Sequence, residues 1–189
     1  DITNHIKNDL INLEIAARDL LGSDYTKRLY DGTARDFGPT LVSISQLAQD
    51  LGQFADIIRA VMEGVDQDDR DVPFYWESKI ILRRLDDYVL ILKNFCQWDE
   101  KRELVFWIQQ KKLPADMAKD GDNLYIVFNQ TPLDISSLMY EGVYEPMASV
   151  VCTSATLKTG RDFRYWAGRT GIHFVERQRV LCREFMSPF

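Results

Sequence analysis

The stretch of sequence that decides the fold runs from Leu41 to Val65 and reads LVSISQLAQDLGQFADIIRAVMEGV. Its apolar residues recur at alternating intervals of three and four, which is the spacing of one face of an α-helix. Leu47, Phe54 and Val61 broaden that face, so the pattern predicts a long helix that packs on at least two neighbours. The residues at the alternating spacing are Leu41, Ile44, Ala48, Leu51, Ala55, Ile58, Met62 and Val65.

Stripes of the same kind lie on both sides of this stretch. An N-terminal stripe predicts a first helix that ends near Gly22, and the glycines, Pro39 and scattered charges that follow predict a loop from Gly22 to Pro39. The polar run 66–71 and Pro73 end the central helix, and a heptad-like repeat beyond them predicts a third helix that returns antiparallel. We therefore expect an antiparallel helical bundle over residues 1–100, with no catalytic role for its apolar stripes. The outer stripes are Ile2, Ile6, Leu10, Leu13, Ala17, Leu20 and Leu21, and Ile81, Leu85, Tyr88, Leu92 and Phe95.

The pattern changes after Trp98. Two short runs rich in β-branched and aromatic residues, 103–109 and 124–128, predict strands. A helix-compatible stretch over 136–144 precedes Ser149-Val150-Val151-Cys152-Thr153, a run of the kind that is buried in a parallel sheet. Strand, helix and strand in this order predict an α/β lobe over residues 101–189, so the fold class is mixed α and β. The rest of this lobe should be a short helix over 161–168, closed near Gly171, and one or two strands within 173–185.

Charge is spread unevenly along the chain. The formal net charge is −6, yet residues 149–189 hold seven Lys and Arg against three acids, about +4, which leaves about −10 for residues 1–148. The three cysteines are widely spaced and form no Cys-x-x-Cys, which argues against a disulfide framework, a zinc site or an iron-sulfur cluster built from them alone. His5 and His173 lack neighbours at ligand spacing, so no metal site is expected. No export signal or membrane span is recognisable, and we expect a soluble, cytoplasmic protein without membrane partners.

The most informative stretch for chemistry is Val150 to Leu157, an apolar run that ends in Thr153-Ser154-Ala155-Thr156. Side chains at the carboxyl end of a buried strand face the ligand crevice of an open α/β sheet, where hydroxyls can position a phosphate or a water. An ordinary strand followed by a Ser/Thr turn and a helix cap is the structural alternative.

The block from Leu124 to Phe189 resembles the DinG and XPD helicases of superfamily two. The resemblance rests on Phe128, on Pro132-Leu133-Asp134-Ile135-Ser136, on the run from Ser149 to Leu157, and on Ser187-Pro188-Phe189, in that order and spacing. It implies that residues 101–189 are the last part of a RecA-like first motor domain, and that residues 1–100 are the helical arch inserted before it. Thr153, Ser154, Ala155 and Thr156 would then form helicase motif III, which couples ATP hydrolysis to movement on DNA.

The chain lacks two sequence motifs that an ATP-dependent helicase needs. It has no Gly-x-x-x-x-Gly-Lys-Ser/Thr loop to cradle phosphates and no Asp-Glu-Ala-His box to hold magnesium, so we expect no ATP hydrolysis from the chain itself. ATP and Mg²⁺ are expected in a parent helicase that moves 5′ to 3′, and an iron-sulfur cluster would lie upstream if the parent has one. The expected partners are single-stranded DNA and the remaining motor segments of the same parent chain.

Two groups of cations are candidates for DNA contact. Arg161 and Arg164 follow the hydroxyl-rich stretch, where positive charge favours phosphate, although exposed helix arginines of no special role fit equally well. Lys27, Arg28 and Arg35 alternate with Tyr25 and Tyr30 in the first loop, a mixture of cations and aromatics found on single-strand-binding surfaces.

A helical protein–protein interaction module without catalytic role is the alternative from another class. In that case the long helices dock a partner and the α/β part is only scaffold. A small standalone enzyme is disfavoured, since no nucleophile with a base, metal cluster or cofactor loop can be identified in the sequence.

Overall fold

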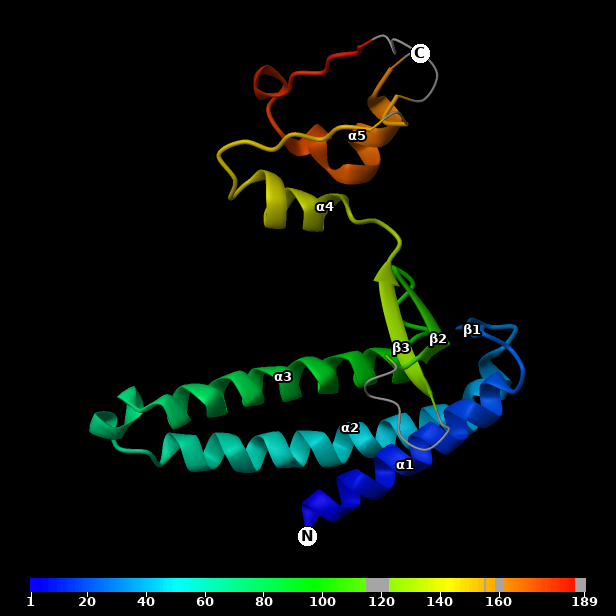
Figure 1. Ribbon diagram of the computed structural model, residues 1–189, viewed down its shortest axis with the longest axis vertical. Coiled ribbons are helices and arrows are strands. Elements are labelled where there is room, and N and C mark those ends of the chain that lie inside the picture. Colours follow the sequence, from blue (N-terminus) through cyan, green and yellow to red (C-terminus); the bar gives the residue numbers. More distant parts are fainter. Residues whose placement is uncertain (115–122, 155, 159–161, 186–189) are drawn as a thin grey trace. The chain divides into compact units, whose positions relative to one another are not determined.

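The computed structural model describes residues 1–114, 123–154, 156–158 and 162–185. The chain divides into two compact units, Asp1–Thr131 and Pro132–Phe189 (Figure 1). The described residues form five α-helices and a three-stranded antiparallel sheet, which confirms the mixed α and β class. None of the described helices combines the length and the apolar composition needed to cross a membrane.

Three long helices dominate unit 1: α1 (Ile2–Leu21), α2 (Ala34–Glu63) and α3 (Pro73–Cys96). Figure 1 shows α2 and α3 side by side and antiparallel, joined by the 3-10 turn η1 (Gln67–Asp71). Proline at the first position of α3 lacks only an N–H that would have no partner there, so Pro73 starts the helix rather than interrupting it. The three helices expected from the apolar spacing are therefore present, and the central pair forms a long hairpin.

The predicted loop from Gly22 to Pro39 was wrong in two respects. Residues Thr26–Leu29 form strand β1, and α2 already begins at Ala34 and contains Pro39. An interior proline removes one backbone hydrogen bond and strains the helix. Phe37 and Thr40, on either side of it, have no exposed surface, so their burial offsets this cost.

The sheet belongs to unit 1 and has the order β1-β2-β3, with β2 at Leu104–Lys112 and β3 at Leu124–Pro132. Both strands predicted after Trp98 are confirmed. β1 pairs antiparallel with β2, with Leu29 opposite Phe106. The domain boundary expected near residue 100 lies inside unit 1, because the strands that follow it share a core with the helices.

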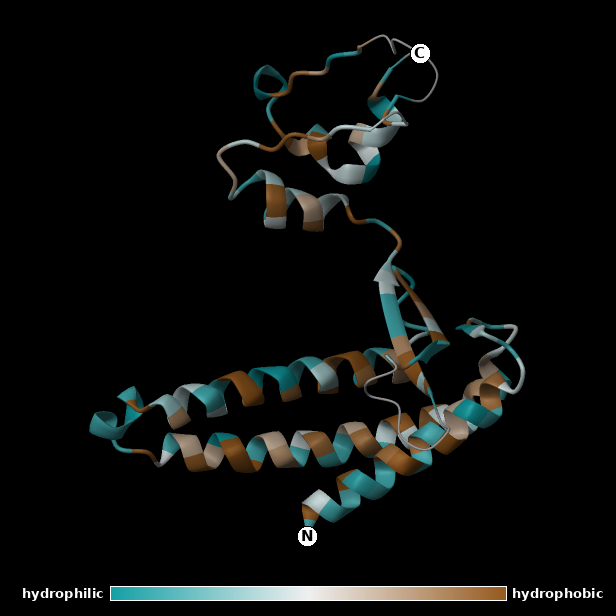
Figure 2. Cartoon of the chain, in the orientation of Figure 1, coloured by the Kyte–Doolittle hydropathy of each residue, from teal (hydrophilic) through white to brown (hydrophobic). Residues whose placement is uncertain are grey.

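One hydrophobic core joins the helices of unit 1 to one face of the sheet. Phe95 of α3 sits at its centre, with its ring 5.0 Å from that of Phe106 and 5.7 Å from that of Phe128, both edge to face. Figure 2 shows apolar residues interleaved with polar ones along α1, α2 and α3. The buried cluster consists of Leu13, Ala17, Leu21, Leu29, Phe37, Ile44, Leu47, Ala48, Leu92, Phe95, Phe106 and Ile108.

Unit 2 contains α4 (Ser136–Met139), which continues as a π-helical turn over Tyr140–Tyr144, and α5 (Arg164–Thr170). The backbone N–H of Ser136 donates to Asp134 at 2.9 Å, which lowers the pKa of that carboxyl. α5 ends at Gly171 in the left-handed conformation, φ 79°, with no room for a side chain, because a Cβ there would overlap the Ser136 carbonyl oxygen. The helices expected over 136–144 and before Gly171 are both present.

The strands predicted at Ser149–Thr153 and within 173–185 were wrong for the described residues. Residues 149–154 are irregular, Val151 is 85% exposed, and the later stretch forms the short turns η3 (Ile172–Phe174) and η4 (Arg177–Arg179). A strand forms only where its backbone groups pair with those of at least one neighbouring strand. The described part of unit 2 supplies none, so an apolar run with strand composition stays unpaired.

Candidate nucleic-acid interface

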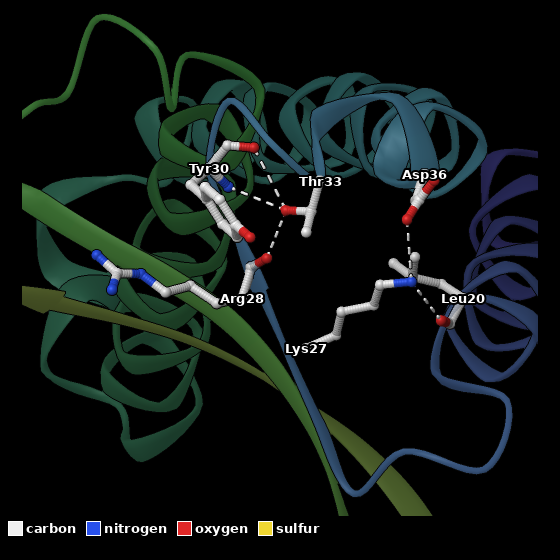
Figure 3. A network of polar contacts seen from close by, with 6 residues as sticks. All are labelled: Leu20, Lys27, Arg28, Tyr30, Thr33 and Asp36. Carbon is white, nitrogen blue, oxygen red and sulfur yellow. Dashed lines mark hydrogen bonds and ion pairs between the residues drawn. The ribbon is translucent and has the colours of Figure 1, made fainter.

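The turn between β1 and α2 is held by Thr33. Its hydroxyl donates to the Arg28 carbonyl oxygen at 2.6 Å and accepts from the Tyr30 backbone N–H at 3.2 Å (Figure 3). One short polar side chain thus ties the last residues of β1 to the first turn of α2. The result is an ordered segment in which the cations expected to contact DNA have defined positions.

Lys27 is held inside this segment. Its ammonium donates to the Leu20 carbonyl oxygen at 3.4 Å and forms an ion pair with Asp36 at 3.2 Å (Figure 3). These contacts join the last turn of α1 to the first turn of α2. The helix dipoles favour a cation such as Lys27 at the end of α1 and an anion such as Asp36 at the start of α2. Lys27 is therefore half-buried and engaged, and it is the least available of the predicted phosphate contacts.

Arg28 and Arg35 remain exposed, as do the neighbouring Tyr25 and Tyr30. In Figure 3 the Arg28 side chain extends away from the polar network. Within the described residues neither guanidinium has a hydrogen bond or an ion pair. Both groups can meet a phosphate without losing an internal partner.

The face of the sheet opposite the core continues this surface. Arg28 lies directly opposite Trp107 on β2, and directly opposed residues of an antiparallel pair project from the same face. Phe106 and Ile108 are buried against the helices, so the alternation of the strand turns Trp107 and Lys111 to the other side. In β3, Ile126 and Phe128 pack on the core, which turns Tyr125 outward. Sequence reasoning missed these residues, because Leu104 to Ile108 is a continuous apolar run that does not show which side of the strand faces the helices.

The hydroxyl-rich stretch lies in unit 2. A hydrogen bond of 3.0 Å joins the hydroxyls of Ser154 and Thr156, and the Thr156 backbone N–H donates to Ser154 Oγ at 3.2 Å. Thr153 and Ser154 line a cavity of about 790 Å³ together with residues of the segment 179–185. Ala155 and Arg161, two of the predicted site residues, lie outside the described residues.

Arg164 opens α5, and its side chain is 91% exposed. Its Nε lies 2.6 Å from Asp162, and its backbone N–H donates to the same carboxyl at 3.0 Å. These hydrogen bonds lower the pKa of Asp162. Because Asp162 neutralises the guanidinium locally, Arg164 would have to exchange this partner to contact DNA.

The residues at this stretch do not fit a bound ATP–Mg²⁺ complex. Lys158, the lysine among the described residues that line the cavity, is ion-paired with Glu184 at 2.5 Å. No group of three or more His, Cys, Asp or Glu within the described residues is arranged to hold a metal ion.

Comparisons with family models, with characterised proteins and with solved structures found no match to this chain.

Proposed function

We propose that the chain is part of a DinG-like, ATP-dependent DNA helicase. Unit 1, with the helices of residues 1–100, acts as its helical arch, unit 2 is the end of its RecA-like first motor domain, and the parent moves 5′ to 3′. The long α2–α3 hairpin is the shape of element that an inserted arch requires. In this function the chain guides single-stranded DNA and relays ATP hydrolysis to unwinding.

One observation carries the proposal: an apolar run that stays exposed within the described part of the chain ends in hydrogen-bonded hydroxyls. Val150 and Val151 are exposed, although apolar runs of this composition are normally buried. The Ser154 and Thr156 hydroxyls that follow are joined to each other, and Ser154 lines an open cavity with Thr153. Further motor strands of the same parent chain would cover the valines and bring the hydroxyls of motif III to the edge of a sheet.

The parent supplies ATP and Mg²⁺ binding from segments other than residues 1–189. Any iron-sulfur cluster would likewise come from upstream segments. The chain alone is expected to show no ATP turnover, and turnover that survives stringent purification would contradict the assignment.

The test uses the product of the full reading frame that encodes this chain. It should contain a phosphate-binding loop, hydrolyse ATP faster when single-stranded DNA is added, and unwind a duplex. In that protein, Ser154→Ala should lower unwinding more than ATP hydrolysis, because the hydroxyl serves coupling. Ser149→Ala, a matched change on the same exposed stretch, should leave both rates unchanged. A reading frame without a phosphate-binding loop would overturn the proposal.

A protein–protein interaction module is the second candidate, favoured by exposed apolar residues near the tip of the hairpin. Phe74 is 77% exposed, and Val61, Trp76 and Ile80 are also exposed. Filter binding separates the two candidates: salt-sensitive affinity of the chain for single-stranded DNA supports the arch, whereas no affinity at low salt supports the interaction module.

A further inference from the structure

The outer face of the three-stranded sheet is the surface of unit 1 that the helices do not cover. Burial alternates along the middle of β2, where Phe106 and Ile108 are 1% and 0% exposed, Trp107 between them is only partly buried, and Lys111 near the end of the strand is exposed. In β3, Ile126 and Phe128 pack on the core, which places Tyr125 on the opposite side of the strand. Four outward residues define what we call the sheet platform: Arg28, Trp107, Lys111 and Tyr125.

The sheet platform combines aromatic rings with unpaired cations. Trp107 lies on the central strand and is partly exposed, directly opposite Arg28, which places their Cβ atoms roughly 4.5–5.5 Å apart. Tyr125 lies on the adjacent strand and is 37% exposed. Within the described parts of the chain, the charged ends of Arg28 and Lys111 have no hydrogen bond or ion pair.

The charge of the strands is opposite to that of the chain. The protein has 29 acidic residues against 23 basic ones. Yet β1, β2 and β3 contain no acid and four cations, namely Lys27, Arg28, Lys111 and Lys112. Lys27 points to the core side, where it meets Asp36. Among the residues of these strands, the platform thus carries two cations and no acid, which is complementary to a phosphate backbone.

We propose that the sheet platform binds single-stranded DNA, with bases stacked on Trp107 and Tyr125 and phosphates held by Arg28 and Lys111. The choice of single-stranded DNA as ligand rests on the proposed function. Stacking on an indole or phenol ring needs an unpaired base whose face is open, whereas duplex DNA offers only its phosphates to such a surface. The platform therefore prefers single strands, without a strong base preference.

The experiment uses the whole 189-residue chain and an oligothymidylate of about 15 nucleotides. Fluorescence anisotropy of the labelled oligonucleotide measures affinity as a function of salt. Quenching of the protein's own tryptophan emission by the unlabelled oligonucleotide measures stacking, because a base stacked on an indole quenches its emission. The chain has four tryptophans, so each substitution assigns part of the signal.

The tryptophan pair is the sharpest comparison. Trp107→Phe keeps an aromatic ring on the platform, so it should abolish most of the quenching while the affinity changes by less than about threefold. Trp76→Phe, the same change on exposed α3, should retain the quenching in full. Quenching that persists in Trp107→Phe would overturn the proposal, whatever the affinity.

Affinity variants test the remaining platform residues. Tyr125→Ala should weaken binding by about tenfold, corresponding to the loss of one stacked base, whereas Tyr125→Phe should bind as the unmodified chain does. Arg28→Ala should reduce the dependence of log affinity on log salt by about one phosphate contact, and Arg84→Ala on exposed α3 should not. Circular dichroism of each variant confirms that the fold is retained.

The outcomes separate this inference from the helicase proposal. If the chain binds oligothymidylate but the platform variants behave like their controls, the sheet platform is not the site and the helicase proposal stands. Equal affinity for a duplex of the same length would also overturn the platform, because it would show contacts to phosphates alone. A chain that binds no DNA at low salt overturns the platform too, and the ATP hydrolysis of the parent protein then decides the helicase proposal separately.

Discussion

Replacing Phe95 by alanine should destabilise unit 1 more than most other single changes. Phe95 is fully buried and makes edge-to-face contacts with Phe106 and Phe128, so it joins α3 to both β2 and β3. Loss of a buried phenylalanine costs about 3–5 kcal/mol from lost transfer free energy and the cavity left behind. The two aromatic pairs, each worth about 0.5–1.5 kcal/mol, place the expected loss near the upper half of that range.

Urea unfolding followed by helical circular dichroism measures this loss, because α1, α2 and α3 hold most of the helical residues. The matched control is Phe74→Ala, since Phe74 lies at the start of α3 and is 77% exposed, so its change should stay within about 0.5 kcal/mol. Phe95→Leu, which retains most of the volume, should cost less than about 1.5 kcal/mol and provides a folded variant if the alanine variant does not fold. A loss of less than about 1 kcal/mol for Phe95→Ala would refute the assignment of the aromatic cluster as the centre of the core.

Two further changes test local features of the units. Gly171→Ala should destabilise unit 2 by more than about 2 kcal/mol, because alanine disfavours the left-handed backbone and its Cβ would overlap Ser136. Gly168→Ala, in open space within α5, should leave the stability unchanged or raise it by about 0.5–1 kcal/mol. The Trp166 emission in denaturant measures both effects, and equal effects would contradict the geometry. In unit 1, burial raises the pKa of the Asp9 carboxyl, and the nearby Asp50 carboxyl raises it further. As the pH rises above 3.8, the ordinary pKa of an aspartate, and through the higher pKa of the folded state, ionisation of Asp9 should lower the free energy of unfolding. Asp9→Asn should then be more stable than the unmodified chain at pH 7 and equal to it near pH 3, and thermal unfolding with the opposite order would contradict this.

Local spacing predicted the elements whose signal is carried within a few turns of chain. The interval of three and four residues from Leu41 onward predicted the central helix, and the same interval predicted its neighbours, because a helix makes its backbone hydrogen bonds within its own segment. The runs that became β2 and β3 were also recognisable, since they are rich in β-branched and aromatic residues and the turn chemistry of 120–123 precedes the second one.

Of the candidate site, the exposed cations Arg28 and Arg35 were predicted as phosphate contacts, but their surroundings were not. Trp107 and Tyr125 were recognised only as strand residues, because the side of the sheet that a residue faces depends on which face the helices cover. The engagement of Lys27 with Leu20 and Asp36 depended in the same way on how two helix ends approach each other.

The sequence by itself determined the helices, the two strands that follow them and the uneven charge, because each of these features depends on residues that are close together along the chain. Only the tertiary structure decided that Thr26–Leu29 is a strand. Its pairing partner on β2 lies about eighty residues away, and its own composition is too polar to predict a strand. Tertiary context also decided the opposite case, the apolar run 149–153, which has strand composition but no neighbour to pair with in the described part of the chain. A strand, unlike a helix, takes its hydrogen bonds from other segments, so its formation is a property of the assembled fold.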